Sequence, residues 1–238
     1  MRCLVAKFDD KEAFVKEVFA KIALRYDFMN SIISLGFDRY WRGAVVKSLG
    51  DINACRGLDV CCGTGKLTKM LSQAVGDDGK VVGLDFSAEM LAIAKGQQHE
   101  KSVVFIHGNA LSLPFPDNCF DFVTIAWGLR NVRDIPKAIA EMTRVLKRGG
   151  DLVSLDMAEP LNPFLRMMYW KIFEKIVPPL GKIIAKDQDA YAYLFESVKA
   201  FPKQDALVKM FCRAGLEDVH YKNLSLGAVA IVKGTKFV

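Results

Sequence analysis

Short apolar runs alternate with amphipathic segments through the middle of the chain. The runs read GLDVCC, VVGLDF, SVVFIHG, FDFVTIAWG and DLVSLDMA, and all lie between residues 56 and 158. Apolar residues at helical spacing fill 67–75, 88–95 and 135–146, and the last of these helices is expected to end in the sequence KRGG at 147–150. Because strand–helix alternation of this kind builds a parallel sheet covered on both faces, the sequence predicts a doubly wound α/β core.

Two helical additions flank this predicted core. Residues 1–50 predict an N-terminal cap, with helical spacing over 11–23 followed by a stretch that is first irregular and then helical. The alternation breaks again after Pro160, and residues of about 160–214 predict an inserted helical flap. Two apolar runs, LEDVHYKNL and GAVAIVKG, then predict a closing hairpin. We therefore expect a cap over 1–50 and a core over 51–238 that contains the flap.

Composition narrows the class of protein. The chain has 238 residues, of which 51% are apolar and 25% charged, as in ordinary globular proteins. Its start lacks the apolar core of a secretory signal, and no run approaches the roughly 20 uncharged apolar residues of a membrane span. We expect a cytoplasmic protein, or one that is peripheral at the inner face of the membrane.

Charge and metal-binding residue types exclude two kinds of site. The net charge of +6 is spread along the chain without a dense basic run, which argues against nucleic acid but permits attraction to anionic lipid. The six cysteines form no C-x-x-C pair, and the three histidines are scattered. No metal site is therefore expected.

The strongest local motif is the glycine turn that follows the first apolar run. Glycine lets the backbone approach a ligand closely at this strand end, and the Asp59 carboxylate could accept hydrogen bonds from the turn or from a ligand ammonium group. Asp85 ends the second run, where an acidic side chain can hold both hydroxyls of a ribose. Asn109 and Ala110 follow the third run, where an adenine ring would bind. The candidate cofactor-binding residues are Asp59, Gly63, Thr64, Gly65, Asp85, Phe86, Asn109, Ala110 and Trp127.

Each of these features alone has an ordinary structural explanation. A single G-x-G is common at strand-to-helix turns, and Asp85 alone could cap a helix. Their joint placement at three successive strand ends favours a cofactor site. A dinucleotide would require a third glycine where Thr68 stands, and Lys66 leaves the turn a poor pyrophosphate cradle. A sulfonium cofactor without phosphates fits this turn better.

Four sequence blocks, spread over most of the chain, resemble those of a known protein family. They are YDFMNSIIS at 26–34 with Trp41-Arg42, LPFPDNCFDFVTIAWGLRNV at 113–132, RVLKRGG at 144–150, and YAYLFESVKAFPKQDAL at 191–207 with the later NLSLGAVAIVKG. With these blocks the chain resembles the ubiquinone/menaquinone-biosynthesis C-methyltransferases from about residue 11 to residue 233. The resemblance implies a class I methyltransferase fold, with a mostly parallel seven-stranded sheet and a C-terminal antiparallel hairpin. It also implies S-adenosylmethionine as cofactor, held in part by Thr64, Asp85, Asn109 and Ala110.

The implied reaction is C-methylation of the ring of a polyprenylated quinol, with demethylmenaquinol to menaquinol as the leading expectation. Several positions depart from the usual family pattern. The family usually has histidine where this chain has Asp38, an acid where it has Lys66, proline where it has Arg148, glutamate where it has Asp156, and serine where it has Ala158. These departures keep other lipophilic substrates open, namely a benzoquinol, a sterol or a phenolic metabolite. A non-catalytic cofactor-binding partner subunit is a further alternative.

Methyl transfer to a ring carbon requires in-line positioning, an electron-rich ring and a dry site. Arg130 and Asn131 follow the fourth strand and should face the methyl group. We expect Arg130 to hold a water or a substrate hydroxyl as an anion and Asn131 to orient it. Tyr26 is the third catalytic candidate and would reach the site from the cap together with Asp27. The alternative is that Arg130 anchors its loop and that Tyr26 and Asp27 only pack or cap helices.

The segment 160–184 carries an aromatic and apolar stripe. Such a stripe most often belongs to a core or to a homodimer interface. A second interpretation is a tunnel or a membrane-facing flap for an isoprenoid tail, with headgroup contacts from the interspersed basic side chains of Arg166, Lys171, Lys175 and Lys182. The expected partners are thus a prenylated quinol, a membrane surface and a second copy of the chain.

Overall fold

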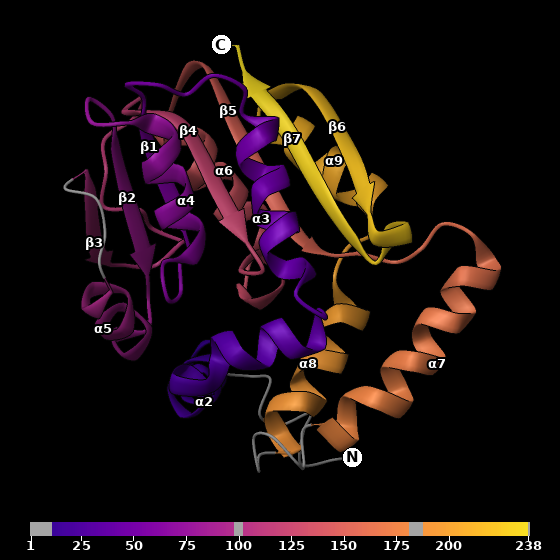
Figure 1. The fold of residues 1–238 in the computed structure, drawn as a ribbon. Helices are drawn as coiled ribbons and strands as arrows, with labels where there is room; N and C mark the ends of the chain where they lie inside the picture. The colour runs from indigo at the N-terminus through magenta and orange to yellow at the C-terminus, as the bar shows by residue number, and fades with distance from the viewer. Residues whose placement is uncertain (1–10, 98–101, 181–187, 238) are drawn as a thin grey trace.

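The computed structural model describes residues 11–97, 102–180 and 188–237. Its centre is a seven-stranded sheet in the order β3-β2-β1-β4-β5-β7-β6 (Figure 1). The strands are β1 Arg56–Val60, β2 Lys80–Asp85, β3 Val103–His107, β4 Phe120–Ala126, β5 Leu146–Met157, β6 Leu216–Leu224 and β7 Val229–Lys236. The first five pair in parallel, whereas β7 runs antiparallel to both β5 and β6. This topology confirms the predicted doubly wound sheet with a closing hairpin.

Helices cover both faces of the sheet and its carboxyl edge. They are α2 Lys11–Ile33, α3 Phe37–Ser48, α4 Lys66–Val75, α5 Ala88–Gly96, α6 Ile135–Val145, α7 Pro163–Leu180, α8 Gln188–Ala200 and α9 Gln204–Arg213. Helices α2, α7 and α8 lie beyond the carboxyl ends of the parallel strands (Figure 1). None of the described helices is long and apolar enough to cross a membrane.

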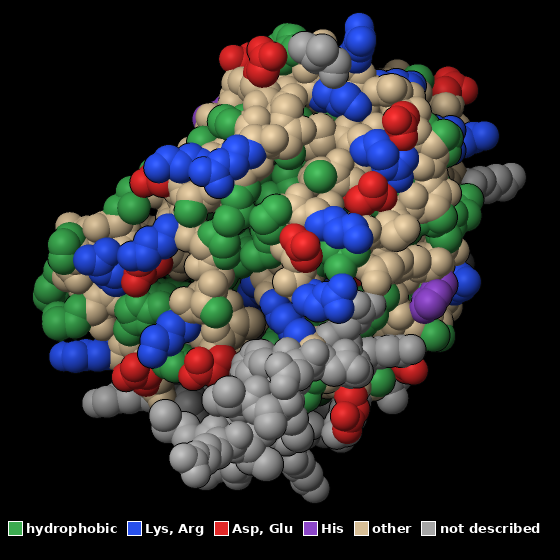
Figure 2. All heavy atoms as spheres, turned by 180° about the vertical axis from the view of Figure 1, so that it is seen from behind, with side chains coloured by type: hydrophobic (Ala, Val, Ile, Leu, Met, Phe, Trp, Pro, Cys, Tyr) green, Lys and Arg blue, Asp and Glu red, His purple; other side chains and the backbone are tan. Residues whose placement is uncertain are grey.

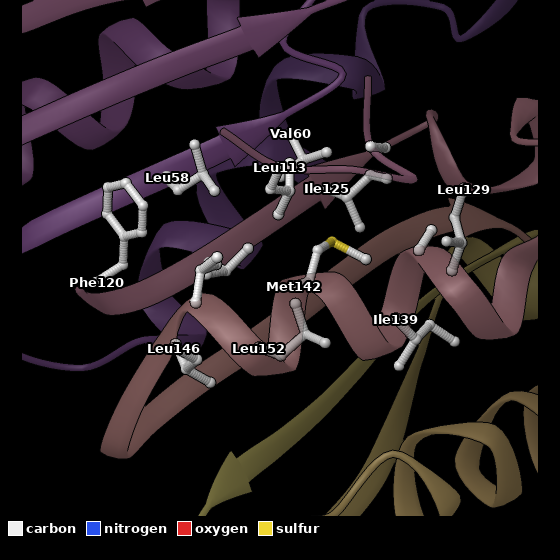
Figure 3. Close-up of a cluster of buried hydrophobic side chains, with 14 of the residues drawn as sticks. Leu58, Val60, Leu113, Phe120, Ile125, Leu129, Ile139, Met142, Leu146 and Leu152 are labelled. Atoms are coloured by element: carbon white, nitrogen blue, oxygen red, sulfur yellow. The ribbon is translucent and has the colours of Figure 1, made fainter. Parts of the chain in front are cut away.

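Two apolar layers hold the helices on the sheet. On one face, Leu58, Val60 and Ile125 of the strands pack against Ile139 and Met142 of α6, all fully buried (Figure 3). The other layer joins α3 and α4 to the opposite face. Because the central strands are buried on both faces, they form continuous apolar runs rather than alternating ones, which is why the sequence reveals them so clearly.

The link between α6 and β5 differs from the prediction. The segment 147–150 was expected to terminate a helix but belongs to β5 instead. Leu146 already adopts extended backbone angles and pairs with Phe120, and the register shifts before Phe122. The two glycines therefore lie at an irregular start of the strand, where basic and glycine residues mimic a helix end.

The cap also differs from the prediction, because α2 continues without interruption to Ile33. It stops where Leu35 and Gly36 take positive φ values of 51° and 79°, and α3 then begins at Phe37. In the flap, α7 packs on α8, whereas Leu207 and Phe211 of α9 lie in the sheet core. The division of the chain into a cap and a core at residue 50 stays a prediction.

Candidate active site

A cavity opens at the carboxyl ends of β1, β2 and β4, beneath α2. It spans about 740 Å³ of space free of protein atoms, part of which is open to solvent. Six of the nine candidate cofactor residues line it, namely Gly63, Asp85, Phe86, Asn109, Ala110 and Trp127. The structure thus brings candidate residues from the ends of β1, β2, β3 and β4 together around one cavity.

The turn after β1 exposes backbone to this cavity. Cys61, Gly63 and Gly65 all have positive φ, at 55°, 56° and 80°. A β-carbon placed on Gly63 would meet no heavy atom of the described residues within 4 Å, so this position faces open space. A ligand can therefore approach the Gly63 backbone without obstruction.

Asp85 is the anchor of the turn. Its carboxylate accepts hydrogen bonds from the backbone N–H groups of Gly63 at 2.8 Å and of Ser87 at 2.9 Å. Burial raises the pKa of Asp85, although these hydrogen bonds favour the charged form. A carboxylate has about four lone-pair sites, so these backbone hydrogen bonds leave Asp85 with acceptor capacity for a hydroxyl group in the cavity.

Three candidate cofactor residues do not line the cavity. The buried Asp59 carboxylate accepts hydrogen bonds from the hydroxyls of Thr68 at 2.6 Å and Thr124 at 2.9 Å, and burial raises its pKa to about 6. Thr64 is buried and turns its hydroxyl toward α2. Gly65 lies against Phe105, where a β-carbon would come within 2.9 Å of the ring. These residues shape the turn from behind.

Helix α2 forms the roof of the cavity through Val15, Phe19 and Tyr26. The first residue of α2 is Lys11. Its ammonium group donates hydrogen bonds to the carbonyl oxygens of Arg130 at 3.1 Å and Val132 at 2.9 Å. Burial, followed by the charge of Arg130, lowers the pKa of Lys11. The loop that carries Arg130 and Asn131 is therefore tied to α2 at this point.

A second fastening lies further along α2. The Asp27 carboxylate accepts a 2.9 Å hydrogen bond from the Thr64 hydroxyl, and Lys66 Nζ lies 3.5 Å from the same oxygen. The Lys66 charge, one of the family departures, thus faces Asp27 rather than a sulfonium ligand. Asp27 lies within α2 and does not cap a helix.

A second cavity of about 480 Å³ adjoins the first. One side of it is apolar and comes from α2, with Val18, Ile22, Met29 and Ile33. The other side is polar, with Arg130, Asn131, Tyr193 and Ser197. Phe19, Tyr26 and Asn131 line both cavities. The two spaces therefore meet at a shared wall that contains two of the three predicted catalytic residues.

Arg130 lines the second cavity only. Its guanidinium donates from Nη1 to the Trp127 carbonyl and to the Asp156 carboxylate, both at 2.8 Å. The pair is buried, and Nε has no hydrogen-bond partner among the described residues. Burial alone would lower the pKa of Arg130, but the Asp156 carboxylate raises it. Arg130 therefore anchors its loop, as the structural alternative holds, and stays cationic.

Asn131 is held from both ends. Its amide nitrogen donates to the Trp127 carbonyl at 2.9 Å, and its amide oxygen accepts a 3.1 Å hydrogen bond from the Tyr193 hydroxyl. Burial raises the pKa of Tyr193 to about 12 and also raises that of Tyr26. Tyr193 was not predicted as a site residue, although it stands in the YAYLFES block.

Sequence reasoning also missed residues that close the first cavity. They come from α2, from the β1 turn, from α5 and from the loops after β3 and β4: Val15, Phe19, Cys61, Met90, Leu111, Val132 and Arg133. Asp38 and Ala158, by contrast, line neither cavity. Asp38 forms a buried ion pair with Arg42, whose guanidinium stacks 4.9 Å above the Trp127 ring. Among the described residues, no His, Cys, Asp and Glu cluster could hold a metal ion.

Comparisons with known proteins agree with this geometry. Residues 7–236 match the model of the ubiE/COQ5 methyltransferase family. The chain is 44% identical to the demethylmenaquinone methyltransferase of Desulfitobacterium hafniense, over 95% of this chain and 91% of that protein. It is 41% identical to the ubiquinone/menaquinone biosynthesis C-methyltransferase UbiE of Shewanella halifaxensis, over 96% and 93%.

Solved structures share the fold at lower identity. A SAM-dependent methyltransferase from Thermotoga maritima is 24% identical with a TM-score of 0.65, covering 93% of this chain and 99% of that one. One from Aquifex aeolicus is 22% identical with a TM-score of 0.59, covering 81% and 88%. At these identities the likeness shows the fold alone, which is that of class I methyltransferases.

Proposed function

The chain belongs to the ubiE/COQ5 methyltransferase family, and from this premise we propose that it methylates a ring carbon of a polyprenylated quinol, with demethylmenaquinol as substrate and menaquinol as product. As a methyltransferase of this fold it uses S-adenosylmethionine as methyl donor. The observation that carries the proposal is the shared wall of Tyr26 and Asn131 between two cavities. One cavity has the residues for the donor, and the other has an apolar wall for a lipophilic acceptor.

The first cavity fits the donor on three counts. Asp85 keeps acceptor capacity for the two ribose hydroxyls, as expected at the end of a second strand. Asn109, Ala110 and Phe86 provide amide groups and an apolar surface for adenine. The open face of Gly63 leaves room for the amino-acid part. When bound, the donor supplies an electrophilic methyl carbon.

The second cavity fits the acceptor ring. Methyl transfer needs an electron-rich ring, and a deprotonated hydroxyl makes it richer. Arg130 is cationic and lines this cavity, so its charge can stabilise a hydroxyl anion in this partly dry site. Asn131 and Tyr26 stand between this hydroxyl and the donor cavity, where they can orient the ring for in-line transfer.

The apolar wall of the second cavity supports a lipophilic ring that has a face without polar substituents. Val18, Ile22, Met29 and Ile33 offer no hydrogen bonds to ring substituents. Asp38 and Ala158, which differ from the usual family residues, line neither cavity. These two differences therefore give little support to a substrate other than a quinol. A benzoquinol, a sterol or a phenolic metabolite remains the alternative that the experiment below tests.

A prenylated quinol is dissolved in a bilayer, so we further propose that the chain works at the inner face of a membrane. Helix α7 supports this with exposed Phe164, Met167 and Met168 and with the basic side chains of Arg166 and Lys171. Lys175 and Lys182 lie outside the side chains that the structure describes. A homodimer is the competing use of the same face of α7.

The test is transfer of a labelled methyl group from S-adenosylmethionine to chemically reduced demethylmenaquinone, run beside a demethylated benzoquinol. Label in the naphthoquinol alone supports the proposal. Label in both means that the enzyme does not discriminate between the naphthoquinol and the benzoquinol ring. No label in either, with donor binding confirmed by calorimetry, would reject the quinol substrate.

A further inference from the structure

Two leucines project into solvent from turns that strain them. Leu35 and Leu226 have positive φ values of 51° and 58°, a conformation that disfavours large side chains. They are also the most exposed large apolar residues of the described chain, at 84% and 78%. Asparagine or glycine would satisfy both turns with less strain and less apolar exposure. These two leucines thus cost stability without contributing to the core.

The two turns lie side by side and continue into α7. The Trp41 indole donates a 2.9 Å hydrogen bond to the Ser225 hydroxyl, and the Trp41 ring stacks on Phe37. At the other turn, Gly227 lies so close to Pro160 that a β-carbon on it would come within 3.0 Å of the proline backbone. We call the exposed apolar side chains of these two turns and of the adjoining starts of α3 and α7 the apolar rim; it consists of Leu35, Phe37, Tyr40, Leu161, Phe164 and Leu226.

Exposed apolar side chains concentrate at this rim and the helices beside it. Of the large exposed hydrophobic residues in the described chain, only Val104 and Phe237 lie elsewhere. The face seen in Figure 2 has basic and acidic side chains spread over much of its surface. An apolar patch confined to one edge is typical of an interaction site rather than of ordinary surface composition.

The rim also adjoins the second cavity. Met29 and Ile33 line that cavity along α2, and the rim begins two residues beyond Ile33. Arg39 is exposed on the same helix as Phe37 and Tyr40, while the neighbouring Asp38 carboxylate is neutralised by Arg42 in the interior. With a net charge of +6 on the chain, the rim combines apolar tips with a positive flank.

We propose that the apolar rim inserts into the headgroup–acyl boundary of an anionic bilayer and that the substrate tail enters the second cavity from this edge. The inference rests on the proposed function for the tail but identifies the inserting surface from exposure, strain and charge. Leucine and aromatic tips flanked by arginine match the chemistry of interfacial binding. The strain at Leu35 and Leu226 is then offset by burial in lipid.

The test uses the intact protein and vesicles of neutral and anionic phospholipid. The double variant L35N/L226N suits both left-handed turns, so its melting temperature should equal or exceed that of the parent. Its binding to anionic vesicles, measured by co-flotation, should fall by roughly tenfold or more because two leucine side chains no longer insert. The matched control is F237S, which removes an exposed aromatic at the opposite end of β7 (Figure 1) and should leave binding unchanged.

Two activity assays separate this inference from the proposed function. With a long-tailed quinol in vesicles, L35N/L226N should lose turnover in parallel with binding, whereas with a short-tailed quinol in solution it should match the parent. Equal vesicle binding by L35N/L226N and the parent would reject the proposal that the apolar rim inserts into the bilayer. So would a parent dimer that L35N/L226N converts to a monomer without loss of vesicle binding. If the parent methylates no quinol in either assay, the proposed function fails, while the vesicle data still decide the rim.

Discussion

Asp27 and Thr64 are joined by a 2.9 Å hydrogen bond that fastens the long N-terminal helix to the turn of the donor site. Val15, Phe19 and Tyr26 of the same helix roof the donor cavity. We expect a donor molecule bound beneath this roof to leave when α2 moves away from the turn. The rate of donor exchange should therefore depend on residues that never touch the donor.

We expect D27A to release S-adenosylmethionine faster than the parent does. Loss of one hydrogen bond and one weak ion pair, together about 1 kcal/mol, corresponds to roughly a fivefold increase in the dissociation rate. Stopped-flow fluorescence with S-adenosylhomocysteine measures it. K66M removes only the 3.5 Å ion pair and should change the rate much less. Identical rates for D27A and the parent would show that α2 is not fastened here.

Removal of the Asp85 carboxylate should abolish donor binding. D85A loses the acceptor for the ribose hydroxyls and also releases the Gly63 N–H at the turn. Two charge-assisted hydrogen bonds are worth about 3 kcal/mol or more, which is a loss of at least about 100-fold in affinity. Isothermal titration calorimetry checks it, with D77N in the exposed turn between α4 and β2 as control. Unchanged affinity of D85A would reject this site.

The strand ends, and with them the positions of the candidate donor residues, were predictable because they depend on local pattern. Buried parallel strands are continuous apolar runs, and Asp85 and Asn109 follow such runs directly. The turn chemistry of Gly63 is equally local. Sequence alone therefore brought six of the nine candidate residues to one cavity at this edge of the sheet, and their role in donor binding stays a prediction.

The remaining parts depend on contacts between segments far apart in the sequence. No local pattern shows that Asp59 turns inward to Thr124, 65 residues away, rather than toward a ligand. The pairing of Tyr193 with Asn131 likewise depends on how α8 packs beside the β4 loop. The KRGG segment misled for the opposite reason, since its local preference is overridden by the pairing of its flanking residues Leu146 and Asp151 with β4.

The ion pair of Arg130 and Asp156 should determine the free energy of unfolding, whereas turnover should depend on Arg130 itself. R130M leaves the Asp156 carboxylate buried without its partner, which should cost about 3–5 kcal/mol of unfolding free energy. The double variant R130M/D156M should recover most of that loss. Turnover should fall about 100-fold or more in both R130M and R130M/D156M, while the donor affinity of each stays within about twofold of the parent value.

Denaturant unfolding and initial rates measure these two effects. R130K serves as the conservative control, because it keeps the charge but not the planar donor geometry. If R130M/D156M turns over like the parent, Arg130 is only a loop anchor.

The buried Asp59 should make stability depend on pH. Its folded-state pKa of about 6 lies above the ordinary value of 3.8, so the folded protein binds the proton more tightly than the unfolded chain does. Its contribution to stability is therefore present below about pH 4 and is lost as the pH rises through 6. D59N should remove this loss and raise the unfolding free energy at pH 7 by up to about 3 kcal/mol.

Asp121 provides a control of opposite sign. Burial would raise its pKa, but the Lys147 ammonium and the Arg56 N–H lower it below the ordinary value. Its stabilisation is therefore present at neutral pH and is lost as the pH falls through the folded-state pKa. D121N should then be less stable than the parent at pH 7. Chemical denaturation between pH 4 and 8 distinguishes the two, and a D59N profile parallel to that of the parent would contradict the assignment.

Tyr193 should position Asn131 rather than bind substrate charge. Its hydroxyl donates to the Asn131 amide oxygen at 3.1 Å, and its raised pKa of about 12 keeps it protonated through the usual assay range. Y193F removes this one hydrogen bond and leaves the Asn131 contact with Trp127 in place. Asn131 would then lose its fixed orientation at the wall between donor and acceptor.

We expect Y193F to lower kcat about fivefold, as for one lost hydrogen bond of about 1 kcal/mol, with KM for the quinol and donor affinity nearly unchanged. The ratio of variant to parent kcat should stay constant from pH 6 to 9, because the phenol does not titrate there. Y221F on the edge strand β6 is the matched control and should leave kcat unaltered. A rise in KM with unchanged kcat would instead mean that the Tyr193 hydroxyl binds the substrate directly, and this would replace the positioning role with a binding one.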